Sequence, residues 1–406
     1  MADILSFTIG TIVQSAGLFI AYFFAAVFIF LILRKLHSLK VTVALLFVFL
    51  GVSIFFYAPN GLPHGFAYPF FLKTYGPADG PVLPFKNVAD FFTHFKNFER
   101  VTDIARNPND VPLPIDRVGT TTVEISLTAK EVIAEMAPGV FINYWTFDGT
   151  VPGPMLRVRE GDTVKLTLNN DPTSLHHHNI DLHAVTGPGG GAVSTMVAPG
   201  EGKTVTFKAL HPGLFVYHCA HPNVANHMTH GMYGLILVEP AEGLSKVDKE
   251  YYLMQGEFYT AGQMGRKGLQ IFDPQAMLDG KPQYIVFNGR VGGLNEKMAM
   301  STGETARFYV GNGGVNLISS FHLIGEVFDR VFPEAAIREP HADIQTTLVP
   351  AGGATVAEFD TQVPGNYVIV DHALSRLDRG AWGVLKVSGE PNPDVYDGEI
   401  TTGHGH

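Results

Sequence analysis

The chain has 406 residues and a formal net charge of −10 at pH 7, a length that accommodates two globular domains and additional segments. The acidic balance argues against binding to nucleic acid and is compatible with a cationic protein partner. The sequence contains 44 Gly, 26 Pro and one Cys. Frequent Gly and Pro are typical of turn-rich β proteins, and a single Cys excludes an internal disulfide.

Two long stretches near the N-terminus, residues 4–33 and 41–57, contain no charged side chain. A helix needs about 20 apolar residues to cross a bilayer, so we expect two transmembrane helices within residues 1–57. The connector, residues 34–40, carries three cationic side chains, which by the positive-inside rule places it in the cytoplasm. The length of the first stretch and the presence of the second argue against a cleaved signal peptide.

Residues 58–117 form a linker rich in Pro and Phe. Within it, apolar residues from Val88 to Ile104 recur at steps of three and four, the spacing of one face of an amphipathic helix. Asn107-Pro108 ends this pattern, and we therefore predict a helix over residues 87–106. The pattern leaves open whether this helix lies on a membrane or packs on a globular domain.

From residue 121 onward, short runs of β-branched and aromatic residues are separated by Gly and Pro. No helical pattern intervenes, which indicates a β-sandwich or barrel. The pattern also repeats, since residues 197–200 have a counterpart in residues 349–352. We infer two similar β domains, residues 118–242 and 243–392, followed by a C-terminal tail.

The stretch of residues 211–233 combines the one cysteine, Cys219, with five histidines and two methionines. A thiolate with imidazole and thioether donors favours copper, and a His₂Cys site with a weak axial Met is the blue-copper, or type 1, arrangement. Cys219, His227 and Met232 supply three of these four ligands from one loop. We expect the fourth in the His-rich stretch of residues 175–183.

Side chains two residues apart on a strand share a face, and adjacent ones point to opposite faces. Asp181 and His183 therefore share a face, while His178 points the other way. His218 and Cys219 must likewise diverge. If His178 and Cys219 bind one metal, the side chains of Asp181, His183 and His218 meet on the other side of the sheet. A second metal could bind there. The bonded link between Cys219 and His218 would then offer a short path for an electron.

Two imidazoles leave the second metal short of ligands, because catalytic sites usually have three protein ligands and one open position. His322 and His372 are both candidates for the third ligand, and spacing alone does not separate them. Asp181 is expected on the same face as a metal-bound histidine, where a carboxylate can transfer protons through water.

Several short motifs occur together in the β region: His-Asn-Ile-Asp-Leu-His at 178–183, Tyr-His-Cys-Ala at 217–220, His227 with Met232, Phe-Asn-Gly at 287–289, His-Leu-Ile-Gly at 322–325 and Asp-His at 371–372. In these motifs, residues 118–392 resemble the copper-containing nitrite reductases. The resemblance implies an all-β fold of two tandem cupredoxin-like Greek-key sandwiches, and a homotrimer of such subunits. Residues 1–117 and the tail, residues 393–406, lie outside the resemblance.

The resemblance also implies roles for individual residues, with one type 1 and one type 2 copper per subunit. The implied type 1 ligands are His178, Cys219, His227 and Met232. The implied type 2 ligands are His183, His218 and, from the neighbouring subunit, His372. Asp181 and His322 would handle protons, and Ile324 would crowd the bound nitrite. The implied reaction is the one-electron reduction of nitrite to nitric oxide and water in denitrification, with the electron passing through Cys219-His218.

Together, the resemblance and the apolar stretches predict a multi-pass protein of the bacterial cytoplasmic membrane with its catalytic domains in the periplasm. The expected electron donor is a c-type cytochrome or a small cupredoxin, and quinol stays open. A two-domain multicopper oxidase is a rival, but only residues 176–178 supply a His-x-His pair in a strand context. A membrane-anchored blue-copper carrier is a second rival, and it gives no reason for Asp181, His183, His322 and His372.

Overall fold

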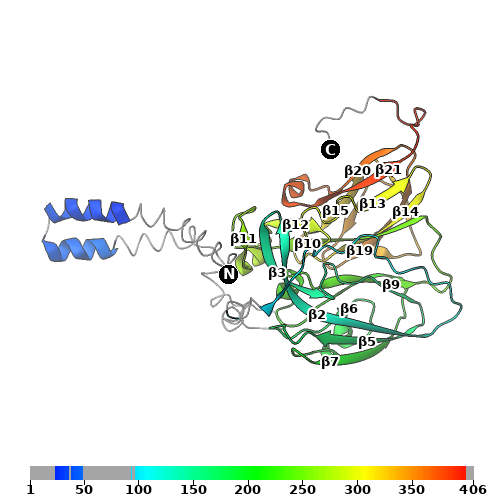
Figure 1. The fold of residues 1–406 in the computed structure, drawn as a ribbon, viewed down its shortest axis with the longest axis horizontal. Helices are drawn as coiled ribbons and strands as arrows, with labels where there is room; N and C mark the ends of the chain where they lie inside the picture. Colours follow the sequence, from blue (N-terminus) through cyan, green and yellow to red (C-terminus); the bar gives the residue numbers. More distant parts are fainter. Residues whose placement is uncertain (1–22, 36–37, 49–92, 94–96, 399–406) are drawn as a thin grey trace.

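The computed structural model describes residues 23–35, 38–48, 93 and 97–398 (Figure 1). Residues 23–35 and 39–48 are helical. Among the residues that are described, none of the helices has both the length and the apolar character needed to cross a membrane. The transmembrane helices predicted over residues 4–33 and 41–57 extend well beyond the described ranges.

The helix predicted over residues 87–106 is wrong in its C-terminal part. Residues Glu99–Arg100 instead form strand β1, which pairs in parallel with β2 (Thr122–Ala137). Phe98 and Ile104 are both buried, but in two different hydrophobic clusters. The apolar spacing therefore reflects two separate anchoring points on the β domains and not one helical face. Most of the N-terminal part of the predicted helix lies outside the described residues.

The first β domain consists of two packed sheets (Figure 1). Besides β1 and β2, its strands are β3 (Val140–Phe147), β4 (Leu156–Arg159), β5 (Thr163–Asn170), β6 (Asp181–Leu182), β7 (Gly202–Lys208), β8 (Gly213–His218), β9 (Tyr233–Glu239) and β11 (Gly268–Leu269). One sheet has the order β11-β3-β2-β5-β7, with β1 beside β2, and the other has the order β4-β9-β8-β6. The short helix α5 (Val224–Met228) connects β8 to β9.

The second β domain also consists of two sheets. Its strands are β10 (Lys249–Phe258), β12 (Tyr284–Phe287), β13 (Met298–Ser301), β14 (Thr305–Asn312), β15 (Ser319–Ile324), β16 (Phe328–Phe332), β17 (His341–Ile344), β18 (Thr346–Val349), β19 (Ala354–Asp360), β20 (Gly365–Asp371) and β21 (Trp382–Ser388). The orders are β12-β10-β14-β19-β16-β17 and β13-β21-β20-β15-β18. Helix α6 (Pro274–Leu278) lies between β11 and β12. The mostly β fold predicted from the sequence is confirmed.

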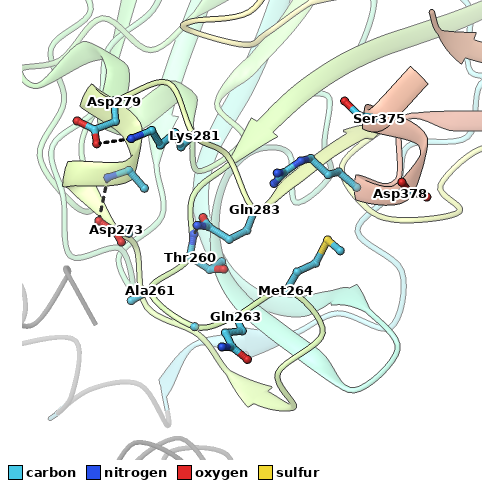
Figure 2. Close-up of a pocket in the computed structure, with 13 residues that line it drawn as sticks. Thr260, Ala261, Gln263, Met264, Asp273, Asp279, Lys281, Gln283, Ser375 and Asp378 are labelled. Atoms are coloured by element: carbon cyan, nitrogen blue, oxygen red, sulfur yellow. Dashed lines mark hydrogen bonds and ion pairs between the residues drawn. The ribbon is translucent and has the colours of Figure 1, made fainter. Parts of the chain in front are cut away.

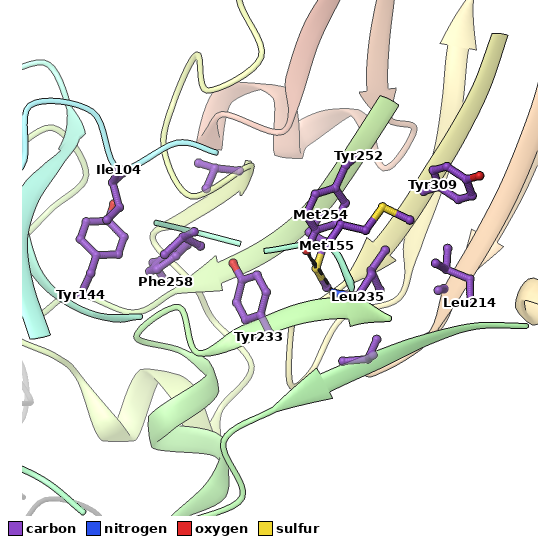
Figure 3. Close-up of a cluster of buried hydrophobic side chains, with 14 of the residues drawn as sticks. Ile104, Tyr144, Met155, Leu214, Tyr233, Leu235, Tyr252, Met254, Phe258 and Tyr309 are labelled. Atoms are coloured by element: carbon purple, nitrogen blue, oxygen red, sulfur yellow. Dashed lines mark hydrogen bonds between the residues drawn. The ribbon is translucent and has the colours of Figure 1, made fainter. Parts of the chain in front are cut away.

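A shared hydrophobic core joins the two domains (Figure 3). Strand β9 is buried along its whole length because its alternate side chains enter two cores. Tyr233 and Leu235 face the shared core, whereas Ile236 belongs to the core of the first domain. From the second domain, Tyr252 and Tyr309 enter the same shared core. Burial of an aliphatic side chain such as Leu235 contributes about 1.5–3 kcal/mol, so the shared core holds the two domains in one fixed arrangement.

Candidate metal centres

The first candidate centre is buried at the end of β8, where the sequence places Cys219. The Sγ atom of Cys219 lies 3.3 Å from Nδ1 of His227 and 3.8 Å from Nδ1 of His178. The amide of Cys219 donates to the carbonyl of Met232 at 3.1 Å. The Met232 side chain is fully buried in the same hydrophobic cluster as Cys219. The structure thus brings three predicted donors together and sets Met232 beside them.

Burial of this cluster disfavours protonation of its imidazoles. Burial lowers the pKa of His227 well below its ordinary value and also lowers the pKa of His178. Burial raises the pKa of the Cys219 thiol to about 12, so a metal ion must displace the thiol proton to bind sulfur. The side-chain oxygen of Asn179 accepts a hydrogen bond from the Ala220 amide at 2.8 Å, which fixes the turn that presents the thiol.

The second candidate centre begins at the residue directly before Cys219. Nε2 of His218 lies 3.2 Å from Nε2 of His183 and 3.9 Å from a carboxylate oxygen of Asp181. Nδ1 of His218 donates to the Cys219 carbonyl at 3.0 Å, which leaves Nε2 for a metal. Burial, followed by the positive charge that His218 can carry, lowers the pKa of His183. These three side chains form a compact set of ligand atoms within 4.8 Å of one another.

The separation into two clusters follows from local pairing. His178 forms an isolated bridge with Val197, and Asp181 pairs with His218 between strands β6 and β8. The alternation of faces assumed a regular strand through residues 178–183, but the strand that forms there is only the two-residue β6. His178 nevertheless lies beside Cys219, whereas His183 lies beside His218.

His322 and His372 lie together on the second domain, with ring centroids 5.2 Å apart. Nδ1 of His322 donates to the carbonyl of Gln345 at 2.6 Å, so its Nε2 is the free ring nitrogen. Ile324, two residues further along β15, is half-buried. Within the part of this chain that the structure describes, neither histidine joins the cluster of His183 and His218.

The turn that carries His372 is held by its neighbour Asp371, which is completely buried. One carboxylate oxygen of Asp371 accepts hydrogen bonds from the amides of Ser320 and Ala373 at 3.2 and 3.1 Å. The other accepts a hydrogen bond from Gln255 at 3.0 Å. These bonds fix the backbone on both sides of His372, while the imidazole itself is exposed.

Sequence reasoning missed an aromatic stack beside the first centre. The Trp145 ring lies between His230, with centroids 4.2 Å apart and planes 14° apart, and His176, with centroids 4.1 Å apart. Its centroid also lies 4.7 Å from that of His227 in an edge-to-face contact. His230 is buried, and its Nδ1 donates to the Asn226 carbonyl at 2.7 Å. The density of histidines around Cys219 was the one signal in the sequence that could have suggested this arrangement.

A separate cavity of about 670 Å³ lies beside α6 and is lined by residues from 260–283 and 375–379 (Figure 2). Its lining contains no imidazole or thiol. Lys281 pairs with Asp279 at 3.1 Å, and Asp273 accepts a hydrogen bond from the Ala276 amide at 3.0 Å. The cavity therefore offers no soft donor set for copper.

The donor chemistry of the first cluster, with two imidazoles, a thiolate and an adjacent thioether, fits a copper site. A family model described as "Multicopper oxidase" matches residues 129–243. This range contains both clusters but not His322 or His372.

Curated relatives extend the similarity over both β domains. The chain is 51% identical over 295 residues to the copper-containing nitrite reductase of Neisseria meningitidis, covering 72% of this chain and 76% of the relative. It is 36% identical over 298 residues to the enzyme of the same name from Rhizobium meliloti, covering 68% of this chain and 79% of the relative.

Solved structures support the same relationship. The copper nitrite reductase from Nitrosomonas europaea aligns with a TM-score of 0.60 and 36% identity, covering 67% of this chain and 96% of that chain. A crystal structure of a multicopper oxidase aligns with a TM-score of 0.56 and 26% identity, covering 71% of this chain and 94% of that chain. Taken with the two clusters of metal-binding side chains, these similarities show that the chain belongs to the copper-containing nitrite reductases.

Proposed function

We propose that this protein is a dissimilatory nitrite reductase that converts nitrite, with one electron and two protons, to nitric oxide and water. The observation that carries the proposal is the pair of donor clusters joined by one peptide bond, because Cys219 belongs to one and His218 to the other. An electron transfer site and a catalytic site can be linked in this way through covalent bonds. The names of the similar proteins agree with this activity.

Copper bound at the two clusters would supply one-electron transfer at the first and a binding position for nitrite at the second. The residues that would hold the type 1 copper are His178, Cys219, His227 and Met232. The residues that would hold the type 2 copper are His183, His218 and the neighbouring subunit's equivalent of His372. The ligands of the first set are buried, which favours electron transfer and excludes substrate, whereas His183 of the second set is exposed.

Asp181 is the proposed proton carrier at the second cluster. Its carboxylate lies 3.9 Å from Nε2 of His218 and its side chain is 26% exposed, so it contacts both the metal-binding imidazole and water. Gly190 makes room for it: a Cβ atom at this position would lie 1.8 Å from Oδ1 of Asp181. The carboxylate can therefore hold a proton next to the position where nitrite would bind.

His322 and Ile324 would act on the same substrate from the other side of the site. The hydrogen bond from Nδ1 of His322 to Gln345 orients the ring and leaves Nε2 as the atom that can exchange a proton with water. Ile324 would limit the space for the bound anion. Both roles require these residues to face the second cluster of an adjacent subunit.

We infer a closed ring of identical subunits on the same argument, and the family resemblance makes this ring a homotrimer. The second cluster offers two imidazoles and a carboxylate, while the exposed His372 lies outside that cluster in the same chain. A closed ring of subunits would let each His372 complete a neighbour's site, as a heterologous interface does when the rotation closes.

Attachment to the bacterial cytoplasmic membrane, with the β domains in the periplasm, is also part of the proposal. It is supported by the two uncharged stretches, residues 4–33 and 41–57. In the described helical residues, apolar side chains such as Phe24, Phe28 and Phe47 are exposed, as expected of a segment that contacts lipid. A cationic c-type cytochrome or a small cupredoxin is the proposed donor, with quinol as the alternative.

Spectroscopy of the full-length protein purified in detergent and loaded with copper tests the proposal. We expect one type 1 and one type 2 signal per chain, a change in the type 2 signal on addition of nitrite, and anaerobic release of nitric oxide with a reduced donor. Oxygen consumption without nitric oxide release would instead indicate a multicopper oxidase. A type 1 signal alone would indicate an electron carrier.

A further inference from the structure

Glu131 is a completely buried acidic residue on β2 whose role the proposed reaction leaves unexplained. It lies opposite Trp145 in the pairing of β2 with β3, and thus on the sheet face that supports the first cluster. A carboxylate is costly to bury unless it is paired and hydrogen-bonded. Its position beside the proposed copper ligands therefore needs a physical reason.

The contacts of Glu131 are concentrated on one oxygen. Oε1 accepts hydrogen bonds from the backbone amides of Leu175 and His176 at 2.7 and 3.0 Å, and from Nδ1 of His176 at 2.9 Å. The same oxygen lies 3.9 Å from Nε2 of His178. Among the described residues, neither Oε2 of Glu131 nor Nε2 of His178 has a hydrogen-bond partner.

The two nitrogens of His178 thus face two different groups. Nδ1 faces the Cys219 sulfur at 3.8 Å, and Nε2 faces the Glu131 carboxylate. If Nδ1 binds a metal, Nε2 carries the ring proton and can donate it only in the direction of Glu131. A carboxylate behind a metal-bound imidazole fixes the ring orientation and increases the basicity of the ligand.

We propose that Glu131 is a positioning residue for the first copper site, which holds His178 in its ligating orientation and favours the oxidised metal through its buried negative charge. This inference rests on the proposed type 1 site. His176 limits the effect, since its Nδ1–H shares the oxygen that faces His178. Removal of the carboxylate charge should favour reduced copper, and removal of the His176 donor should favour oxidised copper.

The substitution Glu131→Gln separates this role from simple support of the loop. The Gln side chain keeps an oxygen that can accept the two backbone hydrogen bonds but loses the charge. Removing such a partner usually weakens metal binding by about 10–100-fold. If the lost charge weakens Cu(II) binding by about tenfold and leaves Cu(I) binding unchanged, the preference for Cu(II) over Cu(I) falls about tenfold. For a one-electron couple this corresponds to a rise of about 59 mV in the reduction potential.

The measurement is a spectroelectrochemical titration of the type 1 band in copper-loaded, full-length protein. Glu124→Gln is the matched control, because Glu124 lies on the same strand and is exposed, so the same loss of charge should leave the potential unchanged. His176→Ala should lower the potential. If Glu131→Gln does not fold, the reduction potential of His176→Ala tests the role of Glu131 in its place.

An unchanged potential in Glu131→Gln, or in His176→Ala where the first variant does not fold, would overturn the role of Glu131. The wild-type spectrum distinguishes this failure from a failure of the proposed function. If the unaltered protein shows no type 1 band, the copper site itself is wrong. If the band is present and the substitutions leave its potential unchanged, only the inference about Glu131 is wrong.

Discussion

The two metal centres differ in how completely one chain builds them. In the first, His178, Cys219 and His227 are all buried and lie together on one domain. In the second, the described part of the chain brings together three side chains, His183, His218 and Asp181, and His183 is exposed. A centre that only exchanges electrons benefits from a closed and rigid donor set, whereas a centre that binds substrate needs an open position. The difference in burial therefore matches the division of labour that we propose.

The substitution with the largest expected effect removes the thiol of the closed centre. Cys219→Ala should abolish the type 1 absorption and reduce turnover with a protein donor to background, because no other thiolate exists in the chain. Copper at the second centre should remain, since His218 keeps its hydrogen bond to the backbone carbonyl of residue 219. Metal analysis, electron spin resonance and donor-driven assays check this prediction. Full activity in this variant would show that the electron does not pass through Cys219.

His372→Ala tests whether the open centre is completed by another subunit. We expect loss of type 2 copper with retention of the type 1 band, measured by electron spin resonance. Because His372 is exposed, the substitution should leave the fold intact, and a circular dichroism spectrum is the control.

Mixed subunits sharpen the same test. In trimers assembled from His372→Ala and His218→Ala chains, about a quarter of the sites should combine an intact His218 with a neighbour's intact His372, if assembly is random and the site is shared. Type 2 copper and activity should then return in part. If both ligands came from the same chain, no mixture of these two variants would regain any site.

Asp181→Asn should have a smaller effect, because the second centre keeps its imidazoles. We expect both coppers to stay bound, turnover to slow by about 100-fold, the usual contribution of a proton-transferring group, and the dependence of kcat on pH to change. Asp116→Asn is the control, since Asp116 is exposed and belongs to neither cluster. Loss of type 2 copper in Asp181→Asn would mean that the carboxylate holds the metal site together.

The sequence was informative wherever one short segment carried the geometry. Neighbouring residues on a strand must diverge, so the assignment of His218 and Cys219 to different clusters needed no knowledge of the fold. The same reasoning gave a correct separation of His178 from His183, although the expected strand is only the two-residue β6. The bridge between His178 and Val197 sets the direction of the His178 side chain. No pattern in the sequence predicts this bridge.

The sequence did not predict features that depend on contacts between residues far apart in the chain or on a second subunit. The spacing of Phe98 and Ile104 suggested a helix, but Phe98 is buried in a small cluster with Ile133, whereas Ile104 is buried in the core shared by the two domains. Glu131 and Trp145 come beside the first centre only through the pairing of β2 with β3. The choice between His322 and His372 rested on the family resemblance, because a site shared with a second subunit, as we propose, would leave no trace in the spacing of one chain.

The smallest expected effect concerns the aromatic stack that braces the closed centre. Trp145→Phe keeps a ring between His176 and His230 but reduces the stacked area, and we expect a loss of about 1 kcal/mol in stability, within the range for aromatic pairs. Chemical denaturation of the copper-loaded protein measures this loss.

Trp382→Phe is the matched control, because Trp382 is the other tryptophan and lies on β21 of the second domain. A loss confined to Trp145→Phe, with a shift of the type 1 band, would show that the stack sets the position of His227 as well as the stability of the domain. Equal losses in both variants would assign Trp145 an ordinary packing role, and the rigidity of the closed centre would then rest on its buried hydrogen bonds.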